Sequence, residues 1–323
     1  MLGRNVYAQQ EIYYTQWILN PYLINCAVAG YDGYTTVNLM SRNQWVGIPG
    51  APNTQSVSAQ TRILKNSFIS RSNKVRKKSK SSTTSGRVGL GALVYNDRVG
   101  LIDRTGFQIT YAYHIPFKSS QLSFGLSLNA YQFKINSTKI VVNDNQTDPL
   151  VDKANLGIFI PDMNFGAYYS AEKYFVGFSA TDLAQAALKI SSGATVDYTL
   201  VRTYNFMGGY KIPITSSFAR RTSKLDIILE PNALIKVSEL GTVQADIGCR
   251  ALFSQAYWAG VSYRTPNIMV IMAGLKVDKF YIGYAFDANF SRIMRSTYGS
   301  HELCITYKFG DSVRRYRWLK KSF

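Results

Sequence analysis

Apolar side chains alternate with small or polar ones through almost the whole chain, in segments too long for an ordinary soluble sheet. In residues 121–134 (QLSFGLSLNAYQFK), large apolar side chains occupy one face, and Ser, Gly or Asn occupy most of the other. The same division recurs in residues 244–253, 280–286 and 301–309. Successive side chains of a strand point to opposite faces, so these segments are predicted to be strands with one apolar face.

Fourteen segments show this strand pattern, and most of them are eight to fourteen residues long. Strands of soluble sheets usually have about five or six residues, whereas a tilted strand that crosses a bilayer has roughly nine to eleven. The length therefore favours membrane-crossing strands. The predicted strands are 34–42, 54–63, 86–96, 104–115, 121–134, 163–171, 173–181, 203–213, 224–237, 243–253, 256–265, 268–276, 279–287 and 301–309.

The connections between these segments alternate in length, which is typical of outer-membrane barrels with short turns on one side and long loops on the other. We therefore predict an all-β fold, a transmembrane antiparallel β-barrel of about 14 strands in the bacterial outer membrane. The one helical signal is a turn or two in residues 182–187 (DLAQAA), too little for a parallel α/β fold. A soluble β-sandwich is the alternative that the pattern leaves open.

Residues suited to catalysis or metal binding are scarce. The two histidines, His114 and His301, are far apart, and the pair at 301–302 is not part of an HExxH motif. The three cysteines form no CxxC pair, and the glycines of residues 86–91 (GRVGLG) precede a strand rather than a helix. The sequence thus predicts no enzyme and no cofactor, and it favours a structural role for His114.

The chain is strongly basic, with 37 Lys and Arg against 19 Asp and Glu and a net charge of +18. Such a balance indicates an anionic neighbour. Residues 71–80 (RSNKVRKKSK) and 314–323 (RRYRWLKKSF) are the most basic runs; the first fits a solvated loop and a docking site equally well. A barrel places both runs in the periplasm, which favours docking. The predicted partner-binding residues are Arg71, Lys74, Arg76, Lys77, Lys78, Lys80, Arg314, Arg315, Arg317, Trp318, Lys320 and Lys321.

Residues 1–33 precede the first predicted strand. Ala8 before Gln9 is compatible with a cleavage region, but the preceding residues lack an apolar core, so this is at most a truncated signal peptide. We expect residues 1–33 to lie in the periplasm or to fill the lumen as a plug. Residues 34–309 would then form the barrel, and residues 310–323 a basic periplasmic tail.

Two motifs, followed by several weaker ones in the same order, resemble the PorP/SprF family of the Bacteroidetes. The specific motifs are residues 16–30 (QWILNPYLINCAVAG) and 42–61 (RNQWVGIPGAPNTQSVSAQT). Two departures are Cys26, where the family usually has Pro, and Gln60, where it often has His. The weaker motifs are 89–100 (GLGALVYNDRVG), 161–169 (PDMNFGAYY), 230–236 (EPNALIK), 258–264 (WAGVSYR) and 299–302 (GSHE).

The resemblance implies a non-enzymatic outer-membrane component of type IX protein secretion and gliding motility. Implied partners are outer-membrane lipid, a periplasmic ring lipoprotein and its partner, a secreted adhesin or other type IX substrate, and a peptidoglycan-binding protein, but no nucleic acid. Trp45 is expected at the membrane interface or against a neighbouring loop. The signature residues, expected to shape loops, are Asn20, Pro21, Asn25, Gly30, Arg42, Gln44, Trp45, Gly47, Gly50, Ala51, Pro52, Thr54, His301 and Glu302.

Two other functions compete with a secretion role. A passive outer-membrane channel for small solutes would need an open lumen, whereas a segment 9–33 inside the barrel would block it. A soluble, basic nucleic-acid-binding protein would be recovered in the soluble fraction rather than in membranes. The sequence leaves open which secreted protein is the client.

Overall fold

The computed structural model describes residues 12–63, 87–135, 158–184, 187–189, 197–199, 201–215, 226–254, 256–291 and 296–310. Two short 3-10 helices, η1 (Pro21–Leu23) and η2 (Cys26–Val28), precede the strands. The strands are β1 (Thr35–Asn43), β2 (Asn53–Ile63), β3 (Val88–Val99), β4 (Ile102–Pro116), β5 (Ser120–Ile135), β6 (Ile158–Ala171), β7 (Tyr174–Thr181), β8 (Ala187–Lys189), β9 (Asp197–Thr199), β10 (Thr203–Tyr210), β11 (Ile212–Thr215), β12 (Asp226–Ser238), β13 (Val243–Phe253), β14 (Tyr257–Arg264), β15 (Ile268–Val277), β16 (Phe280–Asn289) and β17 (Ser300–Phe309).

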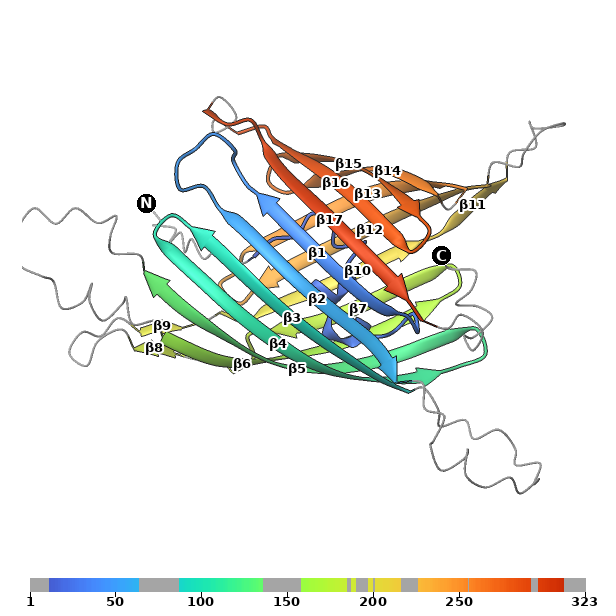
Figure 1. Cartoon of the computed structure of the whole chain (residues 1–323), viewed down its shortest axis with the longest axis horizontal. Coiled ribbons are helices and arrows are strands. Elements are labelled where there is room, and N and C mark those ends of the chain that lie inside the picture. Colours follow the sequence, from blue (N-terminus) through green and yellow to red (C-terminus); the bar gives the residue numbers. More distant parts are fainter. Residues whose placement is uncertain are drawn as a thin grey trace, which may run out of the picture.

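The main sheet closes on itself, because β1 pairs antiparallel with both β2 and β17 (Figure 1). β10 and β11 are separated by Lys211 alone and both pair with β12, so we count them as one strand of the barrel wall, or stave. The closed sheet therefore has 14 staves, and β8 with β9 forms a separate hairpin. Closure leaves no unpaired sheet edge in the bilayer. The prediction of an antiparallel barrel of about 14 strands is confirmed.

The barrel has two distinct ends. We call the end where β1 begins and β17 ends the tail end, and the opposite end the loop end. Long connections at the loop end were expected and occur at 136–157, 182–202 and 290–299, but short ones occur there too, at 100–101, 239–242 and 265–267. The tail-end connections are 64–87, 117–119, 172–173, 216–225, 254–256 and 278–279. The expected separation by length is therefore correct only in part.

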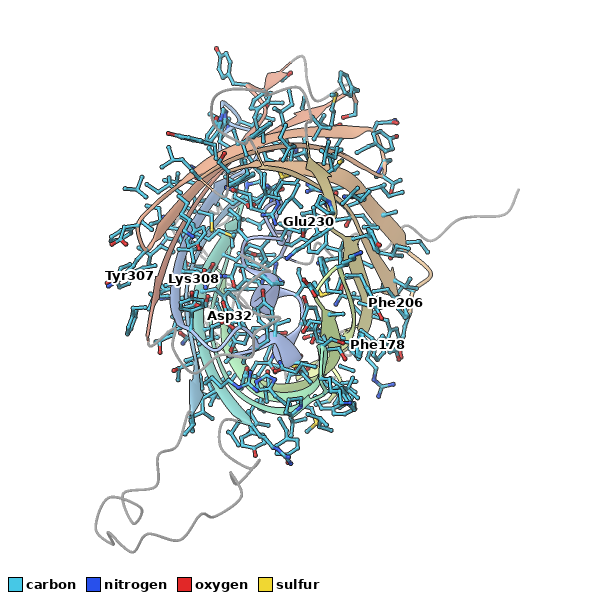
Figure 2. All side chains as sticks on the ribbon, turned by 90° about the vertical axis from the view of Figure 1, so that its right-hand side faces the viewer. Asp32, Phe178, Phe206, Glu230, Tyr307 and Lys308 are labelled. Atoms are coloured by element: carbon cyan, nitrogen blue, oxygen red, sulfur yellow. The ribbon has the colours of Figure 1, made fainter. Side chains whose placement is uncertain are left out.

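The two faces of each strand divide as the alternation predicts. On β5, Leu126 and Leu128 point outward and are 50% and 62% exposed, whereas Ser123 and Ser127 point into the barrel and are fully buried. On β17, Tyr307 lies outside the ring and Lys308 inside it (Figure 2). Outward apolar side chains suit lipid, and inward small side chains leave room inside the barrel. Among the described residues, no helix is long and apolar enough to span a membrane.

A charge on the outward face should test the position of the bilayer. We expect Leu128→Arg, near the middle of β5, to lower the free energy of unfolding by about 2–4 kcal/mol, because arginine at the bilayer midplane is poorly solvated. Gln132→Arg lies on the same face, closer to the loop end, and should cost only about 0–1 kcal/mol. Urea unfolding in lipid vesicles measures both; equal losses would contradict a bilayer centred on Leu128.

Two local predictions differ from the structure. The described residues of 182–187, which are 182–184 and 187, do not form the expected helical turns: Asp182 has a positive φ of 56° and Ala187 pairs with Thr199 in the β8–β9 hairpin. Local alanine content favoured a helix, but cross-strand pairing prevails here. The strand expected at 163–171 begins earlier, as β6 at Ile158, and the strand expected at 203–213 is interrupted at Lys211.

Candidate functional site

The segment that precedes β1 lies inside the barrel (Figure 2), and its contacts extend from the loop end to the tail end. Near the loop end, Thr15 contacts β16 and β17 through Asp287 and Glu302. Near the tail end, the carbonyl of Ala29 contacts His114 of β4, and Gly30 lies against β2. We call residues 12–34 the plug segment. It occupies the interior that the small inward side chains leave.

Glycines on the inner wall mark where the plug segment touches the strands. A Cβ added at any of five inward glycines, on β3, β5, β6 and β16, would overlap plug atoms. Glycine within a strand often marks such a close approach of another segment, here the plug backbone at two positions and plug side chains at three. The five contacts are Gly89 with Ala29, Gly91 with Tyr22, Gly125 with Ala27, Gly166 with Asn25, and Gly283 with Gln16.

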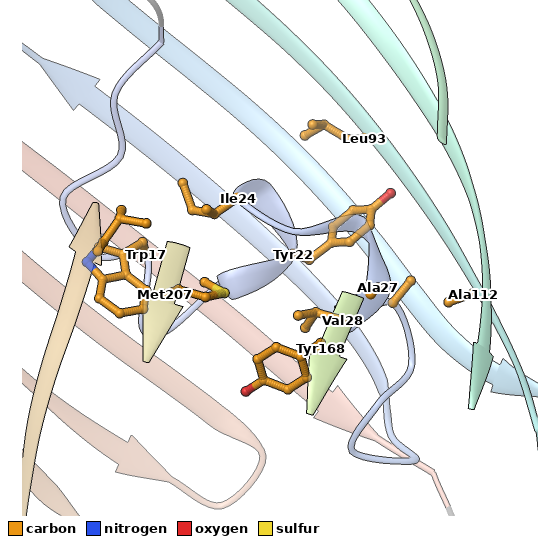
Figure 3. Close-up of a cluster of buried hydrophobic side chains, with 11 residues drawn as sticks. Trp17, Tyr22, Ile24, Ala27, Val28, Leu93, Ala112, Tyr168 and Met207 are labelled. Carbon is orange, nitrogen blue, oxygen red and sulfur yellow. The ribbon is translucent and has the colours of Figure 1, made fainter. Parts of the chain in front are cut away.

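An apolar cluster joins the plug segment to the wall (Figure 3). Trp17, Tyr22, Ile24 and Val28 of the plug pack with wall residues of β3, β4, β6, β10 and β12. The Tyr22 hydroxyl lies 2.7 Å from the hydroxyl of Thr110, and burial raises the Tyr22 pKa to about 12. The buried wall residues of this cluster are Leu93, Ala112, Tyr168, Met207 and Leu234.

Two signature asparagines form hydrogen bonds between the plug segment and the wall. Asn25 donates from Nδ2 to the carbonyls of Ala167 (2.9 Å) and Phe178 (3.0 Å), and its Oδ1 accepts the Ala27 N–H (2.9 Å) as the N-cap of η2. Asn20 donates to the Ser58 hydroxyl at 3.0 Å. A buried amide with these partners fixes orientation as well as position.

A buried ion network lies at the loop end of the plug segment. Arg42 pairs with Asp287 at 2.6 Å and Glu302 at 3.1 Å, and Arg264 pairs with Asp246 and Asp287 at 3.0 Å each. None of the five side chains is more than 3% exposed. Buried charges persist where other charges and hydrogen bonds compensate them. We call these five residues the loop-end network.

The loop-end network also holds the plug backbone. The Glu302 carboxylate accepts the N–H groups of Thr15 and Gln16, both at 2.7 Å. The Thr15 hydroxyl contacts Asp287, Arg42 and Arg264. Two wall strands far apart in sequence, β1 and β17, thus meet the plug at one point next to the seam that closes the barrel.

His114 attaches the tail-end part of the plug segment. Its ring is fully buried, and Nε2 donates to the Ala29 carbonyl at 3.0 Å. Because a carbonyl only accepts, Nδ1 is the acceptor of the Ser123 hydroxyl at 2.8 Å. Both nitrogens are therefore used in structural bonds, as expected of a structural strand-end histidine.

The signature loop 44–52 forms a rigid lip at the loop end. Val46 exchanges backbone hydrogen bonds with residues 298–299, at 2.8 and 2.9 Å, and Gly50 accepts from Gly100 at 2.9 Å. Gly47, with φ 102°, lies against the exposed Tyr298 ring. The backbone N–H of Trp45 donates to the Ser300 hydroxyl at 3.2 Å. Both expectations for the Trp45 ring, at the membrane interface or against a neighbouring loop, stay predictions.

A cavity of about 370 Å³ opens at the loop end above the plug segment. Its floor includes Tyr13, whose ring centroid lies 3.8 Å from the Arg264 guanidinium carbon and 5.0 Å from the Lys236 ammonium. Trp45, Val201, Leu240 and other apolar residues line its walls. A cavity of this size accommodates side chains of a bound polypeptide.

The structure brings most of the signature residues to the plug–wall contact or to the lip. Asn20, Pro21, Asn25 and Gly30 belong to the plug segment, Arg42 and Glu302 to the loop-end network, and Gln44 through Pro52 to the lip, while Thr54 donates to Asp97 at 2.7 Å. His301 instead points outward, 2.5 Å from the Tyr284 hydroxyl. All twelve predicted partner-binding residues, Arg71, Lys74, Arg76, Lys77, Lys78, Lys80, Arg314, Arg315, Arg317, Trp318, Lys320 and Lys321, lie outside the described residues.

Sequence reasoning missed three members of the loop-end network: Asp246, Arg264 and Asp287. A signal was available, because each is an isolated charge on the small-residue face of a predicted strand. A charge directed into a barrel requires a partner there. The partner itself could not be inferred, because it depends on which strands face each other across the lumen.

Comparison with known proteins agrees with the geometry. The model of the family described as type IX secretion system membrane protein PorP/SprF matches residues 6–307. A search of curated proteins finds no match. Similar solved structures include Omp33 of Acinetobacter baumannii (8% identity, TM-score 0.44, 86% of this chain and 100% of that chain) and BamA of Haemophilus ducreyi lacking POTRA domains 1–3 (7%, 0.41, 85% and 70%). These TM-scores carry no argument about function. By the family match, the chain belongs to the PorP/SprF family of type IX secretion system membrane proteins, in the bacterial outer membrane.

Proposed function

We propose that this protein is a plugged, non-enzymatic component of the type IX secretion machinery that binds a periplasmic ring protein at its tail end and holds or guides a secreted surface protein at its loop end. The observation that carries the proposal is the distribution of charge between the two ends. The family match supports the machinery, and the plug segment supports binding rather than solute passage.

Almost all of the net charge belongs to segments attached at the tail end. Connection 64–87 has eight cationic residues and no acidic one, connection 216–225 has three and none, and residues 310–323 have five and one. The two longest loop-end connections, 136–157 and 182–202, together have four cationic and five acidic residues. A basic end attracts an acidic partner and speeds its association. The partner proposed for the tail end is therefore an acidic surface of the ring.

The tail end is assigned to the periplasm in this proposal. Its connections 117–119, 172–173, 254–256 and 278–279 are the tight turns usual on that side, and β17 ends there. The loop end then faces outward with its rigid lip and its 370 Å³ cavity, where a secreted adhesin or another type IX substrate would be held. Residues 71–80 and 314–321 would meet the ring or a peptidoglycan-binding protein.

The interior argues against the passive-channel alternative. The plug segment is fastened to the wall at both ends by Glu302 and His114 and packs an apolar cluster between them. In the described part of the chain, no group of three or more His, Cys, Asp or Glu could hold a metal ion. The proposed mechanism is binding alone.

Charge reversal of the 71–80 run tests the proposal. Changing Arg71, Lys74, Arg76, Lys77, Lys78 and Lys80 to Glu should lower the recovery of co-purified ring proteins from solubilised outer membranes about tenfold, because several peripheral ion pairs of a few tenths of a kcal/mol each are lost. Raising the salt concentration should weaken the wild-type complex in the same direction. Quantitative mass spectrometry of the purified complex measures both effects.

A matched pair of variants separates position from charge. One double variant, Lys77→Glu with Lys78→Glu, reverses two charges in a tail-end connection. The other, Lys139→Glu with Lys153→Glu, reverses two charges in a loop-end connection. The first pair should lower recovery and the second should leave it unchanged. Equal recovery with both pairs, or unchanged recovery with the sixfold variant, would contradict docking at the tail end.

A further inference from the structure

A second cavity, separate from the loop-end cavity, lies near the tail end between the plug segment and strands β13 to β17. It measures about 70 Å³, and we call it the tail-end cavity. Its walls combine cations with aromatic rings. The residues used below are Arg250, Trp258, Lys276, Tyr281, Lys308 and Asp32.

The lining of the tail-end cavity has an excess of positive charge. Arg250, Lys276 and Lys308 line it, against Asp32 as the one carboxylate among its lining residues. Lys308 pairs with Asp32 at 3.1 Å, and both lysine ammonium groups approach the Tyr281 ring, at 5.2 and 5.3 Å from its centroid. Behind the lining, Glu230 pairs with Arg250 at 2.7 Å and also interacts with Lys211. The lining residues therefore have a net charge of +2, and this value stays the same when Glu230 and Lys211 are included.

Buried donors without acceptors line the same cavity. The indole N–H of Trp258 and the Nε–H of Arg250 have no hydrogen-bond acceptor among the described protein groups, and Trp258 is 5% exposed. The Trp258 ring lies across Gly274 and Gly283, which leave space for it, and its centroid is 5.7 Å from the Arg250 guanidinium carbon. A buried N–H group without an acceptor is costly and needs an occupant that accepts. The Thr36 hydroxyl, also unpartnered, supplies a third polar atom.

The hydrogen-bond donors, the excess of positive charge and the small volume together specify the ligand chemistry. We propose that the tail-end cavity binds the phosphate group of a small ligand, with Trp258, Arg250 and Lys276 as donors. The cavity volume suits one tetrahedral oxyanion or a few water molecules and is too small for a peptide side chain with its backbone. The phosphate comes either from inorganic phosphate or from a glycerophosphate headgroup. This assignment does not depend on the proposed secretion role.

Two variants remove one donor each. Trp258→Phe keeps the ring over the glycines and deletes the indole N–H, and Lys276→Gln deletes a charge whose contact is the Tyr281 ring. Titration calorimetry of the purified, detergent-solubilised protein with inorganic phosphate, at constant ionic strength set by chloride, should show one saturable site in the wild type. Each variant should weaken it about tenfold, because a charge-assisted or buried hydrogen bond is lost.

Lys279→Gln is the matched control. Lys279 lies three residues from Lys276 in the exposed turn between β15 and β16, so the variant removes the same charge outside the cavity. Its phosphate affinity should equal that of the wild type, and heat-modified electrophoretic mobility verifies that every variant is folded. Absence of saturable phosphate binding in the folded wild type, or an equal loss in Lys279→Gln, would overturn the proposal.

Glycerol 3-phosphate distinguishes the two sources. If glycerol 3-phosphate competes with inorganic phosphate, the cavity can bind the phosphate of a glycerophosphate headgroup. If it does not compete, free phosphate is the ligand. The proposal stands with either result, provided that Trp258→Phe weakens phosphate binding.

Discussion

Arg42→Met is expected to lower the free energy of unfolding by about 3–5 kcal/mol. Removing one partner of a buried ion pair leaves the remaining charge without compensation. Here Glu302 loses its ion pair with Arg42, and Asp287 keeps its ion pair with Arg264 but loses the one with Arg42. Urea unfolding in micelles, followed by heat-modifiable mobility, measures the loss.

Arg98→Met is the matched control for this prediction. Arg98 also pairs with a carboxylate on a neighbouring strand, Asp103 at 3.1 Å, but its side chain is 68% exposed. Solvent screening reduces such a pair to about 0–1 kcal/mol. A loss below about 1 kcal/mol with Arg42→Met, or the same loss with both variants, would show that the loop-end network does not stabilise the folded state.

The barrel was predictable because its information is local. Each strand carries its own alternation, so β5 and β17 could be assigned, and their lipid faces chosen, without knowing their neighbours. The break at Lys211 and the β8–β9 hairpin were not predictable. They depend on pairing with residues distant in sequence or on a short hairpin with little pattern of its own.

The site was less predictable, because the plug segment has no period to detect. Its residues instead fit the groups on the wall that face them. Asn25 donates to one carbonyl of β6 and one of β7, and Ala27 fits where Gly125 leaves room. The small inward face of 121–134 indicated a space but not its occupant. The resemblance singled out Asn20, Asn25, Arg42 and Glu302 without a physical reason, and the plug–wall contacts now provide one.

A methyl group inserted between plug and wall should displace part of the plug segment without removing it. We expect Gly125→Ala to raise the alkylation rate of Cys26, because the added methyl overlaps Ala27 next to it. In the wild type the thiol is buried and burial raises its pKa to about 11, so little thiolate is present near pH 8. Gly208→Ala, where the nearest atom is 3.5 Å away, should leave the rate unchanged. Equal rates in all three proteins would contradict the contact.

Deleting residues 12–33 should convert a barrel with a blocked lumen into a conducting pore. Barrels of eight strands fill their interior with their own side chains, whereas those of 16–18 leave an aqueous channel, and 14 staves with small inward residues are near the second case. The wild type should show no steady current in planar bilayers, and the deletion variant should show stable single-channel steps. Gly125→Ala, with its plug loosened but present, should show at most brief openings.

The deletion also removes Thr15 and Gln16, which the Glu302 carboxylate binds, so the barrel must be shown to fold before its conductance is measured. Glu302 keeps its ion pair with Arg42 in this variant, and heat-modifiable mobility shows whether the barrel still folds. A folded deletion variant without conductance, or a wild type that conducts steadily, would show that residues 12–33 do not close the lumen. Conductance by the wild type would then favour a solute channel over a binding component.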